Sequence, residues 1–229
     1  YSSVDVVLSA ISNNYSSFYG SLRFFYDVMD QEVAVPQSVI SSNAYFFYIG
    51  ESLGKPMDFN QDGHIDYVFT TGRLSGIGAQ TMIVYGPVAD GEKNVEDYPL
   101  TVFYDPYESE RPRHCVEVVE NFHGDGNATL LVGDQLHEGS NGGVVYFIQD
   151  IDEGYHELDR SGVKIHTNDS VDGYMGFCRR GWGTIERSFL SPGDINGDGF
   201  DDLFIGARNI DTDDSSLYSQ ASIIWGGTP

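Results

Sequence analysis

PGDINGDGFDDLFIGAR, residues 192–208, joins a short acidic loop to an apolar strand, Leu203-Phe204-Ile205. Calcium takes six to eight oxygen ligands at about 2.3–2.6 Å, and a short loop supplies them from alternating positions around a glycine turn. Gly197 and Gly199 allow the positive φ that such a turn needs. Loop positions 1, 3, 5 and 9 carry side-chain oxygens, and position 7 can offer its backbone carbonyl: Asp194, Asn196, Asp198, Asp202 and, at position 7, Phe200. The segment therefore predicts a calcium loop that leads into a strand.

A second copy of this arrangement lies at residues 57–72, MDFNQDGHIDYVFTTG. One run of Asp, Asn and Gly is more often a solvated turn than a metal site. Two matched copies, each followed by an apolar segment, favour two Ca²⁺ sites. The second set of expected ligands has the same spacing, with a backbone carbonyl at position 7: Asp58, Asn60, Asp62, Asp66 and, at position 7, His64.

A third copy, residues 121–133, NFHGDGNATLLVG, has lost most of these oxygens. Asp125 is its one carboxylate, because Asn121, His123 and Thr129 occupy positions 1, 3 and 9. We expect no tight calcium site here and interpret the loop as a glycine-rich turn kept for its shape.

The strands that follow these loops belong to an internal repeat, which predicts the fold. Aligned strands begin at Asp5, Asp66, Thr129 and Asp202, in steps of 61, 63 and 73 residues. Each is followed by a second apolar strand and, in three units, by a third. The strand that leads into each loop is expected at residues 45–49, 115–119 and 183–190. Four-stranded antiparallel sheets repeated at this interval are typical of propeller blades, because only neighbouring blades can cover both apolar faces. The predicted fold class is all-β.

The pattern resembles the FG-GAP repeat of integrin α subunits and related extracellular β-propellers. The resemblance rests on GDINGDGFDDLFIGA at 193–207 with ASIIWGG at 221–227, and on DFNQDGHIDYVFTTG at 58–72 with TMIVYG at 81–86. It implies that the two intact loops join the first and second strands of a blade and bind calcium through the residues named above. The chain departs from the family at Thr70-Thr71-Gly72, where a Gly-Ala-Pro ending is expected, and in the middle copy.

The family's propellers usually have seven blades, so the chain resembles about half a ring. We expect one propeller segment with a partial blade at 1–43, blades at 44–110 and 111–172, and a partial blade at 173–229. Such an arc is expected to be excerpted from a longer protein or completed by further chains, and to be poorly stable alone because two blade faces lie open.

Charge and composition limit the partners. The chain has 35 acidic and 12 basic residues, a formal net charge of −23. Nucleic acid is excluded as a partner, because phosphate binding needs clustered Lys and Arg. No apolar run approaches the ~20 residues of a membrane span, so no direct membrane insertion of this segment is expected.

Calcium loops and the Asn-x-Ser/Thr sequons at Asn14, Asn127 and Asn168 favour a secreted, extracellular or cell-surface glycoprotein. Cys115 and Cys178 can be a disulfide or two buried thiols.

No catalytic or nucleotide-binding motif is present, so we expect no enzyme. The leading hypothesis is a calcium-rigidified adhesion or recognition propeller that binds an extracellular protein or glycan. The alternatives are a propeller scaffold of an extracellular polysaccharide lyase or phospholipase, and a structural subunit of an extracellular filament. Arg179-Arg180-Gly181-Trp182 is interpreted as packing between blades rather than a contact patch, and the acidic segment 211–214 as a solvated turn.

Overall fold

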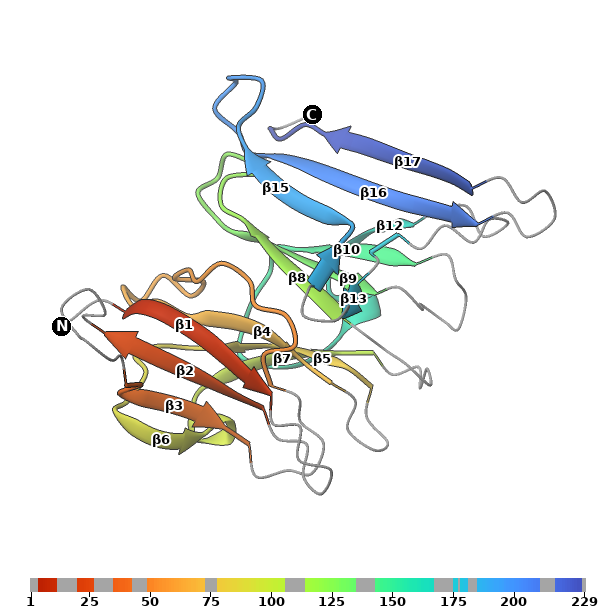
Figure 1. Ribbon diagram of the computed structural model, residues 1–229. Helices are drawn as coiled ribbons and strands as arrows, with labels where there is room; N and C mark the ends of the chain where they lie inside the picture. Colours follow the sequence, from red (N-terminus) through yellow and green to blue (C-terminus); the bar gives the residue numbers. More distant parts are fainter. Residues whose placement is uncertain are drawn as a thin grey trace.

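The computed structural model describes residues 4–11, 20–26, 35–42, 49–72, 78–105, 114–134, 143–166, 175–176, 178–180, 185–210 and 217–227. These residues form β-sheets that follow one another along the chain, as the colours in Figure 1 show. Within them the only helical turns are the short 3-10 turns η2 (Val95–Asp97) and η4 (Leu158–Arg160), and no helix is long and apolar enough to cross a membrane. The predicted all-β class is confirmed.

Four sheets carry the repeat. The first has the order β1 (Val4–Ile11), β2 (Gly20–Tyr26), β3 (Ser38–Ser41) and β6 (Gly91–Asn94). The second has the order β4 (Tyr67–Thr71), β5 (Gln80–Val84), β7 (Leu100–Tyr104) and β11 (Gly154–Glu157). The third has the order β8 (His114–Val119), β9 (Thr129–Asp134), β10 (Val144–Ile148) and β12 (Val163–His166). The fourth has the order β15 (Phe189–Gly193), β16 (Asp202–Ile210) and β17 (Leu217–Ile224).

The central strands are buried on both faces, as blade stacking requires. Every residue of β4, β5, β9 and β10 is buried. Successive side chains of a strand point to opposite faces, and along β4 they enter different cores. Tyr67 and Phe69 pack with residues of the first sheet, whereas Val68 packs with residues of the third. A further core joins the third sheet to the fourth through Leu131 and Ile205. The sheets therefore stack face to face, consistent with part of a β-propeller.

Two strands cross from one repeat to the sheet of the preceding repeat, which the sequence did not predict. β6 pairs in parallel with β3, and β11 pairs in parallel with β7. Each crossing strand is followed by a 3-10 turn whose apolar residue, Val95 or Leu158, is 2% or 1% exposed in the core between the two sheets. These two sheets are therefore not wholly antiparallel, and the second and third repeats are each fastened to the preceding repeat by backbone hydrogen bonds as well as by side chains.

Of the three strands expected to lead into the loops, one lies largely outside the described residues, one is divided into two strands and one is found as expected. Residues 45–48 lie outside the described part of the chain, and the residues that pair with β4 come later, through backbone bonds at Gly50, Ser52 and Gly54 and a bridge at Met57. Segment 183–190 contains two strands: β14 (Ile185–Arg187) pairs with β13 (Cys178–Arg180), and β15 pairs with β16. The third such strand, β8, lies where it was expected.

Two polar features are built into the third sheet. Cys115 on β8 is disulfide-bonded, and the sequence contains one other cysteine, Cys178. The question that the sequence left open is thus answered for Cys115 in favour of a disulfide. His114, beside it, is 1% exposed, and its Nδ1 lies 3.3 Å from the hydroxyl of Thr81 in the second sheet. Burial lowers the pKa of His114 to about 4.

Truncating the residue that follows a crossing strand should weaken the molecule. Leu158→Ala is expected to reduce the free energy of unfolding by about 2–5 kcal/mol, because it opens a cavity between the second and third sheets. Tyr155→Ala on the same crossing strand is the matched control, since Tyr155 is 72% exposed and its loss should change stability by less than about 0.5 kcal/mol. Urea denaturation measures both, and equal midpoints would contradict a fastening role for the crossing segment.

The buried imidazole should make stability depend on pH. Because the pKa of His114 is lower in the folded chain, the unfolded chain binds a proton first as the pH falls below about 6.5. Stability is therefore lost between pH 6.5 and pH 4, by up to about 3 kcal/mol from this group. Urea denaturation of wild type and His114→Asn across this range should show a shallower slope in the variant. Parallel curves would exclude His114 as the source.

Candidate metal centre

The loop between Met57 and β4 is closed by its own acidic side chains. The carboxylate of Asp58 accepts hydrogen bonds from the backbone N–H groups of Asp62 and Gly63, at 3.0 and 2.8 Å. The amide oxygen of Asn60 accepts a second bond from Asp62 N–H at 3.1 Å, and Asp62 accepts one from His64 N–H at 2.8 Å. Positions 1, 3 and 5 are thus brought together around one turn.

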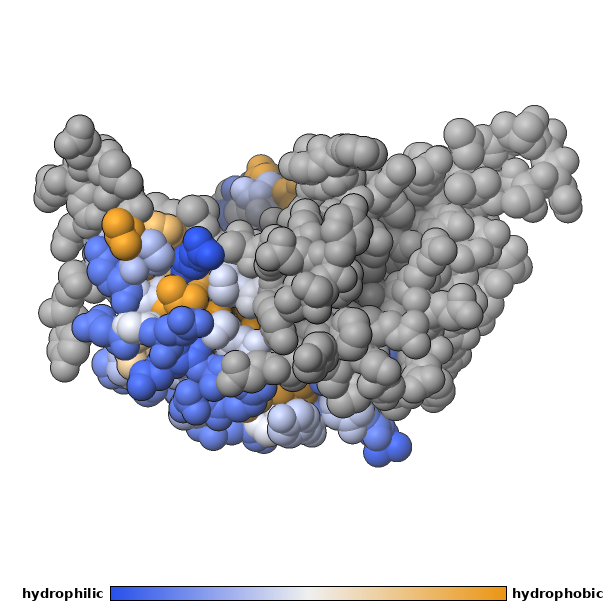
Figure 2. Space-filling model, turned by 60° about the horizontal axis from the view of Figure 1, so that its bottom comes forward, coloured by the Kyte–Doolittle hydropathy of each residue, from blue (hydrophilic) through white to orange (hydrophobic). Residues whose placement is uncertain are grey.

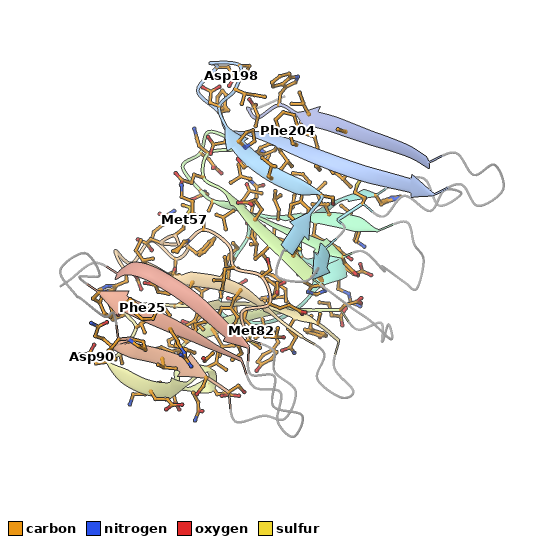
Figure 3. All side chains as sticks on the ribbon, viewed as in Figure 1. Phe25, Met57, Met82, Asp90, Asp198 and Phe204 are labelled. Atoms are coloured by element: carbon orange, nitrogen blue, oxygen red, sulfur yellow. The ribbon has the colours of Figure 1, made fainter. Side chains whose placement is uncertain are left out.

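The loop between β15 and β16 repeats this network. Asp194 accepts bonds from the N–H groups of Asp198 and Gly199 at 3.2 and 2.8 Å, Asn196 from Asp198 at 2.9 Å, and Asp198 from Phe200 at 2.9 Å. Each loop also has an Asn side chain that donates to the carboxylate at position 5, at 3.0 Å in one and 2.8 Å in the other. Asp198 lies on the loop that projects beyond β15 (Figure 3). The two predicted sites therefore share one structure.

The carboxylates at position 9 have a different environment from the others. Asp66 and Asp202 are both 0% exposed, whereas positions 1, 3 and 5 lie near the surface. One oxygen of Asp66 accepts from Phe59 N–H at 2.7 Å and the other from Gly86 N–H at 2.9 Å. Asp202 does the same with its counterparts, at 2.9 and 3.0 Å. Position 9 therefore ties the loop to the end of the next strand.

The glycines that donate to these carboxylates, Gly86 and Gly226, end the segments TMIVYG at 81–86 and ASIIWG at 221–226. A Cβ on Gly86 would lie 2.4 Å from the carbonyl oxygen of Ile65, and one on Gly226 would lie 2.3 Å from that of Asp201. No other residue fits such an approach. The recurrent glycine after the second apolar strand was the signal for this contact, because it marks close backbone packing.

The protonation of the acidic groups follows from these contacts. The backbone N–H of His64 holds the pKa of Asp62 below its usual value, and that of Gly199 does the same for Asp194. Burial raises the pKa of Asp66, against the opposing effect of its backbone N–H donors. The contacts of Asp62 and Asp194 therefore favour their charged forms, while Asp66 carries its charge at a cost.

The donor set fits calcium in its chemistry. It consists of oxygens alone, and the carboxylate oxygens of Asp58 and Asp62 each accept one hydrogen bond in their loop, so each keeps a second lone pair for an ion. Among the described residues, however, no group of three or more His, Cys, Asp or Glu side chains is gathered closely enough to form a metal centre. Asp58, Asn60 and Asp62 lie around one turn, and Asp66 faces the strand end. The residues that would hold an ion are therefore those at positions 1, 3 and 5 first.

The third loop uses its substitutions to contact its neighbours. The side-chain N–H of Asn121 donates to the carbonyl oxygen of Gly199 at 2.8 Å, which an Asp at this position could not do. Its backbone carbonyl accepts from Asp201 N–H at 3.1 Å. Gly124 has a φ of 76° and lies against the ring of Phe200. On its other side, Asn127 accepts a bond from the side chain of Gln61 at 2.7 Å. The three loops therefore form one connected edge.

Other sequence candidates lie largely outside the described residues. These include the sequons at Asn14 and Asn168, the acidic segment 211–214, and residues 181–182 of the Arg-Trp cluster. Asp125, in the third loop, accepts bonds from the backbone and side chain of Asn127, which lower its pKa, the backbone bond being the larger cause.

Comparison with known proteins gives one assignment. The FG-GAP repeat family matches residues 188–218, which span β15, the second acidic loop, β16 and the start of β17. No curated protein matches the chain. An FG-GAP repeat is thus present in the fourth sheet, and the expected repeat type is confirmed there.

The tie made by position 9 should be separable from any role in metal binding. Asp66→Asn is expected to lower the free energy of unfolding by about 1–3 kcal/mol in the presence of a chelator, because an amide offers one acceptor oxygen to two buried N–H donors. Asp62→Asn is the matched control, since Asp62 is exposed and Asn keeps the acceptor for His64 N–H. Thermal and urea unfolding without calcium measure both. If the two variants are equally stable, Asp66 does not tie the loop to the end of the next strand.

Proposed function

We propose that this chain is a calcium-stabilised propeller segment of an extracellular protein that recognises another protein or a glycan. The observation that carries the proposal is the pair of loops with one hydrogen-bond network and one set of oxygen donors, at residues 58–66 and 194–202. Two loops 136 residues apart in sequence thus present the same arrangement of carboxylate and amide oxygens, and their negative charge would be neutralised by a bound divalent cation.

Three observations support an extracellular location. Extracellular calcium is abundant enough to fill sites of weak affinity. The disulfide of Cys115 is typical of oxidising compartments. FG-GAP repeats are typical of extracellular adhesion and recognition propellers, and one is present here. The protein would act by binding rather than by catalysis.

The proposed partner is not a nucleic acid, because the chain is strongly acidic. Where the described residues are visible, the face in Figure 2 is largely hydrophilic with small apolar areas. A partner with basic side chains, or a hydroxyl-rich glycan, suits such a surface. Calcium would hold the loops at one edge of the stacked sheets in a fixed conformation. Binding of the partner would then not have to pay the entropy cost of ordering these loops.

Calcium titration tests the metal assignment. We expect isothermal titration calorimetry to give two Ca²⁺ per chain, and the melting temperature to rise with calcium because the ion binds the folded state. At 100 times the dissociation constant, each site should contribute about 2.7 kcal/mol. Asp62→Ala and Asp198→Ala should each leave one site, and the double variant should leave none.

The third loop supplies the control. Asp125→Ala removes a charge of the same kind from a loop that lacks the other donors, so it should leave two Ca²⁺ per chain. Magnesium, which demands a smaller octahedral cage, should stabilise the wild type less. The proposal fails if the wild type melts at the same temperature in calcium and in chelator, or if Asp125→Ala removes as much binding as Asp198→Ala.

A further inference from the structure

Two outer strands of the stacked sheets receive a parallel strand from the repeat that follows. On β3, Gly91 lies opposite Ser38 and Asn94 opposite Ser41. On β7, Gly154 lies opposite Thr101. Backbone N–H of Gly91 donates to Gln37 at 2.9 Å, and the Thr101 hydroxyl donates to the carbonyl oxygen of Asp152 at 2.6 Å. The same docking therefore occurs twice, at matched positions of two repeats.

The two docked segments share a short pattern that accounts for their binding. Each begins with a glycine at positive φ, 86° for Gly91 and 132° for Gly154. Four residues later comes the apolar residue that enters the core between the sheets, Val95 or Leu158. The strand between them is largely polar, mostly exposed in β6 and mostly of intermediate exposure in β11. The shared element is thus Gly-x-x-x-Val/Leu in an extended conformation.

A third strand, β12, occupies the same position in the third sheet without such a cover. Ser38, Thr101 and Val163 are equivalent, because they pair with Phe24, Ile83 and Phe147 in the corresponding neighbouring strands. Ser38 and Thr101 are 0% exposed, whereas Val163 is 71% exposed. Among the described strands, β12 pairs with β10 alone. Its outer edge, over Val163 to Ile165, therefore lacks the strand that covers β3 and β7.

The core beneath this edge lies between the third and fourth sheets, and Ile165 on β12 packs against it, partly buried. By strand pairing, Ile165 is the equivalent of Ile40 on β3 and of Phe103 on β7. Ile40 shares a core with Val95, and Phe103 shares one with Leu158. An incoming Val or Leu would therefore pack beside Ile165.

We propose that the outer edge of β12 binds a parallel β-strand of the Gly-x-x-x-Val/Leu kind, supplied by a further repeat of this type. The glycine would lie opposite Val163, and the apolar residue, four positions later, would pack beside Ile165 towards the other end of β12. Addition of a strand to an open sheet edge derives its affinity from main-chain hydrogen bonds and its specificity from side-chain pockets. The uncovered edge of β12 offers the main-chain groups, and Ile165 offers the apolar contact.

The test uses two capped peptides that copy the docked segments, residues 152–161 (DEGYHELDRS) and 89–98 (ADGEKNVEDY). Added to the full chain at high salt, which screens acidic repulsion, each should slow amide hydrogen exchange at residues 163–166. Exchange at residues 100–104, already covered by β11, should stay unchanged. Replacing Leu158 by Asp within the peptide should weaken binding about tenfold or more, because the apolar contact is lost.

Controls separate strand addition from other binding. A peptide N-methylated along its strand keeps its side chains but loses main-chain donors, so it should not protect β12. The proposal is overturned if neither peptide slows exchange at residues 163–166, or if the scrambled, Asp-substituted or N-methylated peptides act equally well. It is also overturned if residues 163–166 are protected without peptide in proportion to protein concentration, since the occupant would then be a second copy of the chain.

Discussion

The central strands of this chain are apolar on both faces, and no sheet built from them can bury itself. Tyr67 and Val68 are neighbours in sequence, yet they belong to different cores because side chains alternate across a strand. Each sheet consequently needs a sheet on either side, which forces repeats to stack in chain order. The same rule explains the fourth sheet, where Leu190 and Ile223, on the face turned away from the third sheet, are 49% and 42% exposed.

Stacking also determines how the acidic loops relate to one another. They follow equivalent strands, so they line up along one edge of the arc, close enough for Gln61 to bond Asn127 and for Asn121 to bond Gly199. The middle loop gave up carboxylates and gained an amide donor, so it joins its neighbours directly instead of repelling them. An ion held by either outer loop would consequently stiffen the middle loop as well. The middle loop thus keeps the glycine turn of the outer loops but contacts its neighbours through side-chain amides instead of presenting the same set of carboxylates.

The sequence predicted those features that repeat at a fixed spacing and carry a strong pattern. The acidic loops, the strand after each of them and the next apolar strand all have such a pattern, and β9 and β10 lie where they were expected. The crossing strands β6 and β11 have none, because four mainly polar residues do not alternate and their partners lie in another repeat. The sequence also did not predict that position 9 is buried. The spacing treats Asp62 and Asp66 alike as ligands, whereas the fold exposes Asp62 and buries Asp66.

The difference between the acidic positions explains how each acidic loop is ordered by its own hydrogen bonds. The outer carboxylates are held by backbone N–H groups, which lower the pKa of Asp62 and Asp194 and keep them charged at neutral pH. Their contribution to stability is present above the pKa of the unfolded chain and is lost as the pH falls through the lower folded value. Asp66 behaves oppositely, because burial raises its pKa and its charge costs stability as the pH rises past that of the unfolded chain. A cation close to position 9 removes that cost while the N–H network stays in place. The loop is therefore shaped by its own backbone, and the ion would add stability without having to fold it.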